Sequence, residues 1–285
     1  FVADYKGLVL HIAIGGIEKI EEDDRHVWIR TGAGENWHRL VRYCVDRGWG
    51  GIENLSLIPG TVGAAPIQNI GAYGVELQEV FESLEAINVQ NGEAETFSKS
   101  RCRFGYRDSI FKRELKGKYV VTRVVLRLSK QPVLNTSYGA IESMLKEKGI
   151  EDPDIRDISD IVIEIRESKL PDPAKVGNAG SFFKNPVIDL DRYRQLKREY
   201  PSMPGYSLDG NRIKVPAGWL IEEIGWKGKT VGNTGTYRQQ ALVIVNHGGA
   251  TGEEILELAQ QIKESVAETF GIELVPEVNI IGQDE

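Results

Sequence analysis

The sequence has few of the residues that build metal, disulfide and membrane structures. Its 285 residues include only two cysteines and four histidines. Cys44 and Cys102 lie far apart without a metal-binding spacing, so we expect two free thiols and no metal site. No apolar run approaches the ~18 residues that a membrane span needs, and no signal-peptide pattern is present. These absences predict a protein of the reducing cytoplasm that does not bind membranes.

A net positive charge is also absent. The 35 Lys and Arg residues are outnumbered by 42 Asp and Glu residues, which gives a formal net charge of -7. Nucleic-acid binding generally requires a basic face, so we expect no nucleic-acid partner. A hydrophobic content of 41% and a charged content of 27% are ordinary for a globular protein. The length suits one large domain or two moderate ones.

Apolar periodicity predicts the elements of a first domain. Residues 7–14 form an apolar run that predicts a strand, and we therefore expect the sequence to begin inside a domain. A helix is expected from Trp37 to Arg47, with Gly48 as its stop. Asp154 is a plausible N-cap for another helix. Further strands are expected at 27–30, within 75–97 and at 119–128, and a further helix up to about residue 148.

The second half of the chain shows mixed helices and strands. Pro171 and Pro173 stop a helix and stiffen a link, so they mark the domain boundary. Thr251 and Glu254 form a capping box that opens a helix. The sequence therefore predicts an α+β protein with a first domain over 1–170, a second over 171–271, and a C-terminal strand within 272–285 that returns to the first domain. Other elements expected here are helices at 190–199 and 216–224 and strands at 241–246 and 274–281.

Residues 58–74, IPGTVGAAPIQNIGAYG, combine glycines and prolines with apolar residues and contain no charge. Such a segment does not form a regular helix. It can expose successive backbone N–H groups as a nest for a phosphate. The alternative is a buried structural loop, whose backbone polar groups would then need partners inside the protein. The Gly-Ala-Gly at 32–34 lacks the third glycine of a dinucleotide-binding fingerprint, so we expect no such site there.

Two other segments carry polar groups suited to a ligand. In GNAGSFFKNP, residues 177–186, glycines frame Ser181 and allow a close approach of backbone to a flat ligand. The alternative is a turn that leads into an edge strand. Arg166 and Lys169 are three residues apart near the end of a predicted helix, where two cations suit a diphosphate. They suit compensation of the helix dipole equally well.

These segments, taken in order, resemble one family. IPGTVGAAPIQNIGAYG is followed by YRDSIFK, KLPDP, GNAGSFFKNP, AGWLIE, RQQALV and PEV. Together they resemble the UDP-N-acetylenolpyruvoylglucosamine reductases, bacterial flavoenzymes of peptidoglycan precursor synthesis. The resemblance covers nearly the whole chain, and SYGAI at 137–141 is similar to the tyrosine loop of the type I branch.

The resemblance implies a fold and a reaction. The fold is an FAD-binding domain of the vanillyl-alcohol-oxidase type, followed by an α+β substrate domain. The family's GGGSN turn does not occur here, so we expect the first βαβ unit of the FAD domain to be absent. In the implied reaction NADPH reduces FAD, and flavin N5 passes a hydride to C3 of the enolpyruvyl group. Protonation at C2 gives UDP-N-acetylmuramate. We expect a monomer in the cytoplasm.

The resemblance also implies residue roles. Hydride addition leaves enolate character that needs electrostatic stabilisation and a nearby proton. Arg107 and protonated Glu277 take the first role, and Ser181 is the expected acid; the alternative for Ser181 is a hydrogen bond to flavin or substrate. The expected substrate-binding residues are Tyr138, Arg166, Lys169, Asn185, Lys214 and Gln240. The expected FAD-binding residues are Pro59, Gly60, Gly63, Ala64, Ile67, Gln68, Gly71, Ala72 and Val121.

Two alternatives remain from the sequence. One is another FAD-dependent oxidoreductase that acts on a sugar or an alcohol. It would need a base beside the reactive flavin atom, and no histidine lies near the motifs. The other is a UDP-sugar-binding protein without catalytic activity, which the expected absence of the first βαβ unit favours.

Overall fold

The chain divides into two compact units. A computed structural model describes residues 2–208 and 210–282. One unit spans Val9–Arg166, and the other combines Glu167–Glu285 with the first eight residues. Each unit contains both helices and strands, which confirms the predicted α+β class.

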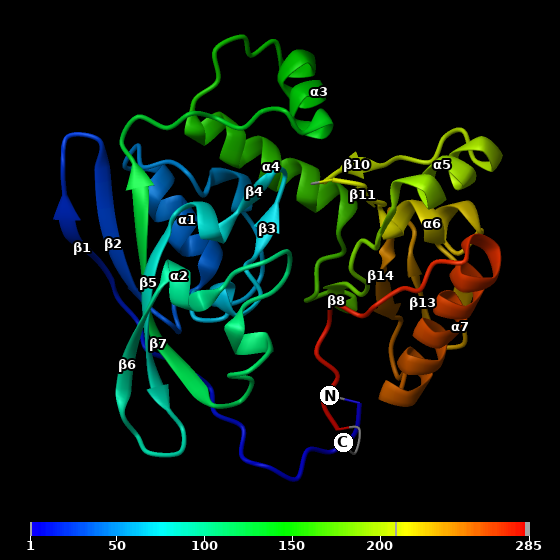
Figure 1. The fold of residues 1–285 in the computed structure, drawn as a ribbon, viewed down its shortest axis with the longest axis horizontal. Helices are drawn as coiled ribbons and strands as arrows, with labels where there is room; N and C mark the ends of the chain where they lie inside the picture. The colour runs from blue at the N-terminus through cyan, green and yellow to red at the C-terminus, as the bar shows by residue number, and fades with distance from the viewer. Residues whose placement is uncertain (1, 209, 283–285) are drawn as a thin grey trace. The chain divides into compact units, whose positions relative to one another are not determined.

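The unit spanning 9–166 is built on a five-stranded antiparallel sheet (Figure 1). Residues alternate between its two faces, so Val27 and Ile29 are fully buried while Trp28 between them is partly exposed. A short hairpin lies apart from this sheet and pairs β3 (Gly71–Ala72) with β4 (Val75–Glu76). In sheet order the five strands are β1 (Ile17–Glu22), β2 (His26–Gly32), β7 (Tyr119–Ser129), β5 (Phe81–Asn88) and β6 (Ala94–Ser98).

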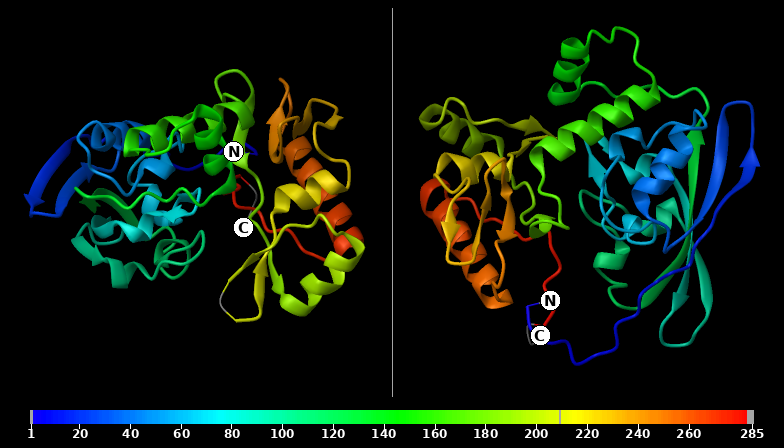
Figure 2. Two further views of the ribbon diagram at one scale, coloured as in Figure 1. Left: turned by 90° about the horizontal axis from the view of Figure 1, so that it is seen from above. Right: turned by 180° about the vertical axis from the view of Figure 1, so that it is seen from behind.

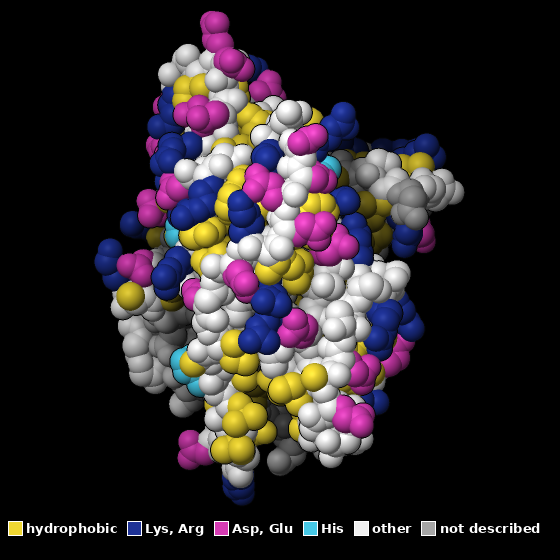
Figure 3. All heavy atoms as spheres, turned by 90° about the vertical axis from the view of Figure 1, so that its left-hand side faces the viewer, with side chains coloured by type: hydrophobic (Ala, Val, Ile, Leu, Met, Phe, Trp, Pro, Cys, Tyr) yellow, Lys and Arg dark blue, Asp and Glu magenta, His cyan; other side chains and the backbone are white. Residues whose placement is uncertain are grey.

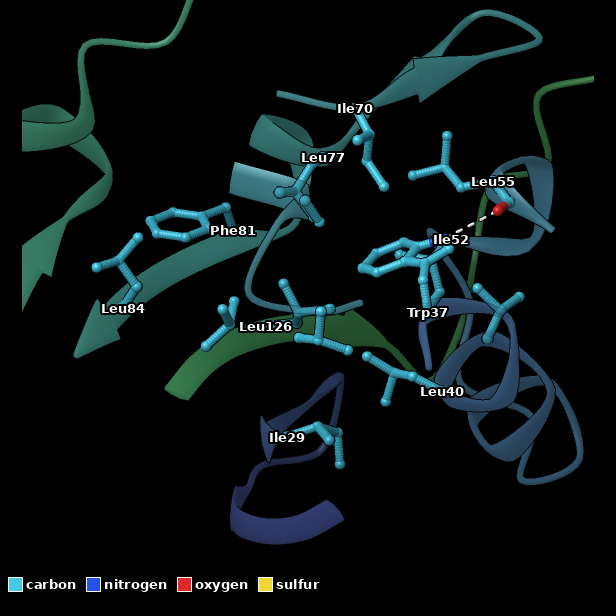
Figure 4. Close-up of a cluster of buried hydrophobic side chains, with 14 of the residues drawn as sticks. Ile29, Trp37, Leu40, Ile52, Leu55, Ile70, Leu77, Phe81, Leu84 and Leu126 are labelled. Carbon is cyan, nitrogen blue, oxygen red and sulfur yellow. Dashed lines mark hydrogen bonds between the residues drawn. The ribbon is translucent and has the colours of Figure 1, made fainter. Parts of the chain in front are cut away.

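Helix α1 (Trp37–Val45) supplies the centre of this unit's core. Its N-cap is Asn36, whose side-chain oxygen accepts a hydrogen bond from Arg39 N at 3.0 Å. The buried Trp37 indole donates to the Leu55 carbonyl at 2.9 Å, so the ring is fixed within the apolar cluster of Figure 4. The other helices here are α2 (Lys99–Cys102), α3 (Gly139–Lys148) and α4 (Ile155–Lys169), with 3-10 turns η1 (Glu53–Leu55), η2 (Ala65–Ile67), η3 (Leu77–Glu79) and η4 (Ile110–Lys112).

The second unit packs helices on a four-stranded antiparallel sheet (Figure 2). Helix α7 (Gly252–Phe270) has the predicted capping box of Thr251 and Glu254, and Gly271 ends it at a φ of 62°. The four strands in order are β12 (Thr230–Val231), β13 (Thr234–Tyr237), β14 (Gln240–Asn246) and β8 (Gly177–Ser181). The remaining elements are α5 (Leu190–Glu199), α6 (Ala217–Glu223) and a smaller sheet of β10 (Tyr206–Ser207), β11 (Arg212–Lys214) and β9 (Val187–Asp189).

Two predicted strands are wrong. Residues 7–14 have no strand partner, and Leu8 is 81% exposed and Leu10 64% exposed. Near the C-terminus, described residues 272–282 form only an isolated bridge, between Phe183 and Pro276, instead of the expected strand. Apolar composition alone does not make a strand, because a strand needs a neighbour to accept and donate its backbone hydrogen bonds.

Both cysteines are free and buried. Burial raises the pKa of the Cys44 thiol to about 12 and has the same effect on Cys102, because an apolar surrounding disfavours the charged thiolate. Across the described residues, none of the helices is both long and apolar enough to cross a membrane. Figure 3 shows acidic and basic side chains interspersed over the visible face, in keeping with the small negative net charge.

Candidate flavin and substrate site

The glycine-rich loop is held by its own unit. Val62 N donates to Glu35 O and Gly63 N to Ala33 O, both at 2.9 Å. A β-carbon at Gly63 would lie 2.5 Å from the Ala33 β-carbon, so only glycine allows this close approach. The interpretation of this stretch as a phosphate nest is therefore wrong at Val62 and Gly63. Their N–H groups are bonded inside the protein, because the segment before α1 runs beside the loop.

The outer side of the same loop presents small residues. Pro59, Gly60 and Ala64 are exposed, whereas Val62 and Ala65 between and beside them are buried. Gly60 has a φ of +109°, and apart from its two chain neighbours none of the described residues has an atom within 4 Å of where its β-carbon would be. The residues present therefore fit a flat ring system at Gly60, where no side chain of the described residues blocks its approach to the backbone. Of the remaining residues expected to bind FAD, Ile67, Gln68, Gly71 and Ala72 are half-buried and Val121 is buried in the core.

Strained backbone gathers around this loop. Among the described residues, five that are not glycine adopt a positive φ, and all lie between positions 57 and 107. A left-handed conformation costs free energy for a residue with a β-carbon, so surrounding contacts must hold it, and such strain clusters at functional sites. These residues are Leu57, Asn69, Tyr73, Arg103 and Arg107.

The loop that carries Arg107 is fastened to the glycine-rich loop at three points. The Arg107 guanidinium donates from Nη2 to the Gly71 carbonyl at 2.6 Å. Buried Asn69 donates to Gly105 O at 3.0 Å, and the Ser109 hydroxyl donates to Ile67 O at 2.6 Å. The structure thus brings the expected catalytic arginine onto the segment expected to bind FAD.

Arg166 and Tyr138 are brought together by a residue that the sequence did not single out. Arg166 Nε donates to Leu57 O at 3.2 Å, and the Tyr73 hydroxyl interacts with the same guanidinium. The Tyr73 and Tyr138 rings meet edge to face with centroids 5.1 Å apart, a favoured geometry for aromatic pairs. Burial lowers the pKa of Arg166 and raises that of Tyr73, because it disfavours the charged form of each. In the sequence, the feature that could have pointed to Tyr73 is its position in the glycine-rich segment, between Gly71 and Gly74.

In the second unit, Ser181 and Glu277 lie on adjacent backbone segments. Ser181 is the exposed last residue of β8, at the edge of its sheet and paired with Val243 of β14. Glu277 N donates to the Phe182 carbonyl at 2.8 Å, directly after Ser181. Half-buried Glu277 is thereby fixed beside the expected acid. Residues 177–181 are themselves an edge strand, so the alternative interpretation of this segment describes its backbone correctly. The Ser181 side chain is nevertheless exposed and open to a ligand.

Three expected substrate-binding residues lie around the start of α6. Asn185 Oδ1 accepts a hydrogen bond from Ala217 N at 2.9 Å, the first residue of that helix. A β-carbon at Gly218 would lie 2.9 Å from Gln240 Oε1, so the amide of Gln240 also lies against this turn. Lys214 ends β11 one residue before Val215, whose N–H donates to Pro186 O. These positions group three polar side chains in one unit.

Lys169 is exposed at the last position of α4.

Among residues 2–208 and 210–282, no group of three or more His, Cys, Asp or Glu side chains could hold a metal ion.

Comparison with known proteins assigns both units. Residues 2–98 match the FAD binding domain, and residues 172–281 match the C-terminal domain of UDP-N-acetylenolpyruvoylglucosamine reductase. The chain is 56% identical over 281 residues to the UDP-N-acetylenolpyruvoylglucosamine reductase of Amoebophilus asiaticus, covering 99% of this chain and 83% of that protein. The chain belongs to the UDP-N-acetylenolpyruvoylglucosamine reductase family.

Two further members agree. The reductase of Flavobacterium johnsoniae is 48% identical over 279 residues, which cover 98% of this chain and 83% of that protein. The crystal structure of UDP-N-acetylenolpyruvylglucosamine reductase (MurB) from Thermus caldophilus matches with a TM-score of 0.60 and 26% identity, covering 88% of this chain and 71% of the other. The matched domains contain the glycine-rich loop, Ser181 and Glu277, whereas Arg107, Tyr138 and Arg166 lie between the two matched ranges.

Proposed function

We propose that this reductase converts UDP-N-acetylglucosamine enolpyruvate to UDP-N-acetylmuramate, a step of peptidoglycan precursor synthesis, with NADPH as the reductant and FAD as the carrier. Membership of the reductase family supports the reaction, and the match to an FAD binding domain supports the cofactor. Two buried free thiols suit a cytoplasmic enzyme. We also propose a monomer, which light scattering of the purified protein would test.

FAD would be held by the glycine-rich loop, chiefly along the exposed backbone of Pro59, Gly60 and Ala64. Gly71 and Ala72 would contribute from the β3–β4 hairpin, with Gly63, Ile67, Gln68 and Val121 supporting the loop from within. When bound, FAD supplies the hydride that reaches C3 of the enolpyruvyl group. The small residues allow the cofactor to approach, and they exclude water by close contact.

Arg107 and Glu277 would stabilise the negative charge that develops on the substrate carboxylate. The Gly71 carbonyl accepts from one N–H of Arg107 and orients the planar guanidinium, whose fork of several donors suits a carboxylate. Glu277 can donate a hydrogen bond to a carboxylate when it is protonated. A backbone carbonyl therefore helps to place each of the two residues. Gly71 O holds the Arg107 side chain, and Phe182 O holds the backbone of Glu277.

The observation that carries the assignment of the acid is the 2.8 Å hydrogen bond from Glu277 N to Phe182 O. It holds the tail of the chain against the segment that presents the Ser181 hydroxyl. A serine is a weak acid, so proton delivery to C2 depends on positioning and on a nearby group that returns the proton. Lys184 follows three residues later and is half-buried, so it is a candidate for that group.

Each unit carries residues for the nucleotide sugar. Tyr138 and Arg166 belong to the unit of residues 9–166, and Lys169, Asn185, Lys214 and Gln240 belong to the other. Lysine and arginine bind phosphate oxygens, whereas the amides of Asn185 and Gln240 suit hydroxyl and carbonyl groups of the sugar.

Substitution of Ser181 by alanine separates the two half-reactions. We expect NADPH to reduce the bound flavin at nearly the wild-type rate, because that step needs no proton from Ser181. Oxidation of the reduced flavin by UDP-N-acetylglucosamine enolpyruvate should slow by about 10²- to 10⁴-fold, the usual contribution of a positioned acid. Stopped-flow absorbance of the flavin measures both steps.

The matched control is half-buried Ser265→Ala on α7, where the hydroxyl bonds to Gln261 O of its own helix. It should leave both half-reactions unchanged. Equal losses in the two half-reactions of Ser181→Ala would remove Ser181 from the role of acid. A wild-type protein that binds FAD but never transfers a hydride to the substrate would refute the reaction itself.

A further inference from the structure

Arg166 carries a charge that its own unit does not neutralise. The Leu57 carbonyl accepts a hydrogen bond from it and the Tyr73 hydroxyl interacts with it, and both of these groups are uncharged. In the described part of the chain, none of the carboxylates forms an ion pair with it. A partly buried guanidinium without a carboxylate is poorly compensated, so an anionic ligand would gain a strong, charge-assisted interaction there.

Tyr73 is held in place from several directions. Buried Asn54 donates from Nδ2 to the Tyr73 carbonyl at 3.0 Å and to the Asn135 carbonyl at 2.9 Å. The Tyr73 ring packs against the apolar cluster of α3 and α4 and against the Tyr138 ring. Its φ of 49° is a left-handed conformation that these contacts maintain. The hydroxyl is therefore presented to Arg166 in a fixed position.

The tyrosine loop is fastened to the same hairpin. Asn135 Nδ2 donates to the Gly74 carbonyl at 3.0 Å, and Asn135 Oδ1 accepts from the Ser137 hydroxyl at 2.8 Å. Tyr138 follows Ser137 and meets the Tyr73 ring. The hairpin residues 71–76 thus contact both members of the expected substrate pair, and Gly71 in the same hairpin orients Arg107.

We propose that Tyr73 is a positioning residue for substrate binding, which orders the Arg166 guanidinium and the Tyr138 ring to receive the diphosphate of the nucleotide sugar. This inference rests on the proposed function. The diphosphate is favoured over the enolpyruvyl carboxylate because Lys169 lies on the same helix three residues after Arg166. Two cations at that spacing suit two phosphates, and a planar guanidinium binds phosphate oxygens in pairs.

Tyr73→Phe removes only the hydroxyl and keeps the ring contact with Tyr138. We expect the dissociation constant for UDP-N-acetylglucosamine, which has the diphosphate but no enolpyruvyl group, to rise by about five- to tenfold, which is the net contribution of one typical hydrogen bond. Isothermal titration calorimetry of the FAD-loaded protein measures it. In turnover, KM for the enolpyruvyl substrate should rise by a similar factor, with kcat nearly unchanged.

Two controls separate positioning from a general structural effect. Tyr119→Phe removes a hydroxyl of the same unit that donates to Glu95, so it should leave binding unchanged. In an Arg166→Gln background, Tyr73→Phe should add no further loss, because it acts through the guanidinium. Equal circular dichroism spectra of all variants would show that each one folds.

Several outcomes would overturn the proposal. An unchanged dissociation constant in Tyr73→Phe would do so, as would losses that multiply fully in the double variant. Weakened binding of the enolpyruvyl substrate alone, with UDP-N-acetylglucosamine unaffected, would show that Arg166 binds the carboxylate of the substrate and not its diphosphate. A wild-type protein that binds both nucleotides normally but does not reduce the enolpyruvyl group would count against the proposed reaction and leave the role of Tyr73 supported by the binding data.

Discussion

At the scale of a single residue, the lack of a side chain at Gly71 allows its backbone to hold the charged guanidinium of Arg107 in place. Its carbonyl accepts the hydrogen bond from Arg107 at 2.6 Å. A β-carbon built at Gly71 would lie 2.9 Å from Arg107 Nη1 and 3.0 Å from Val75 O. Of these neighbours, the end of the arginine side chain moves most easily, because Val75 is held in the β3–β4 pair. An added methyl group would therefore displace the guanidinium.

We expect Gly71→Ala to lower kcat by about 10- to 100-fold, which is less than the ~10²- to 10³-fold cost of removing one oriented donor, because the guanidinium is displaced and not removed. Gly71 is also expected to contact FAD, so kcat is taken per bound flavin. Flavin absorbance gives the content and steady-state NADPH oxidation gives kcat. The variant Gly71→Ala with Arg107→Lys should be no slower than Arg107→Lys alone. A full additional loss in that pair would mean that Gly71 acts independently of Arg107.

At the scale of an element, the start of helix α6 depends on the side chain of Asn185, which is also expected to bind the substrate. It has only seven residues, and its first N–H donates to Asn185 Oδ1. The N–H groups of the first turn of a helix have no carbonyl acceptor within the helix, so they need a partner from elsewhere. The amide nitrogen of Asn185 has no part in that cap, so it is the group expected to meet the substrate. Stability and binding can therefore be separated at this position.

Asn185→Asp keeps the capping oxygen and removes the amide donor, whereas Asn185→Ala removes both. Both variants should raise KM for the enolpyruvyl substrate. Only Asn185→Ala should lose stability, by about 1 kcal/mol, as is usual when a helix N-terminal cap is removed. Urea unfolding and steady-state kinetics measure the two effects. A wild-type KM in Asn185→Asp would restrict this residue to the cap.

At the scale of the whole molecule, the described residues form two large hydrophobic cores and one smaller cluster of α3 and α4. One includes Trp37 and Leu126 in the unit of residues 9–166, and the other includes Phe183, Leu220 and Phe270 in the second unit. All residues expected to bind FAD lie in the first of these units. A ligand stabilises the unit that binds it, increasingly so as its concentration exceeds its dissociation constant.

We expect saturating FAD to slow amide hydrogen exchange in α1 and β2, and to leave exchange in α7 nearly unchanged. Exchange reports local opening, so it assigns the stabilisation to a unit directly. Mass spectrometry of peptides from the two units, with and without FAD, measures it. Equal protection of α7 would show instead that the units open together.

Local patterns in the sequence determined most of the elements. The Thr251–Glu254 capping box and Gly271 located both ends of α7, because caps depend on residues within one turn. The apolar face of α1 was predicted for the same reason, although the helix ends at Val45 instead of Arg47. The strands expected at 7–14 and 274–281 did not form, since a strand depends on a partner that is distant in the sequence.

The motifs likewise indicated the family and its cofactor, and the catalytic roles of Ser181, Arg107 and Glu277 stay predictions. The sequence did not reveal what holds these side chains: the Gly71 carbonyl under Arg107, the Phe182 carbonyl on Glu277, and the Tyr73 hydroxyl on Arg166. Each is a contact between segments far apart in the chain, and two of them depend on left-handed backbone at Arg107 and Tyr73. Local propensity disfavours that conformation, so only tertiary contacts could decide it.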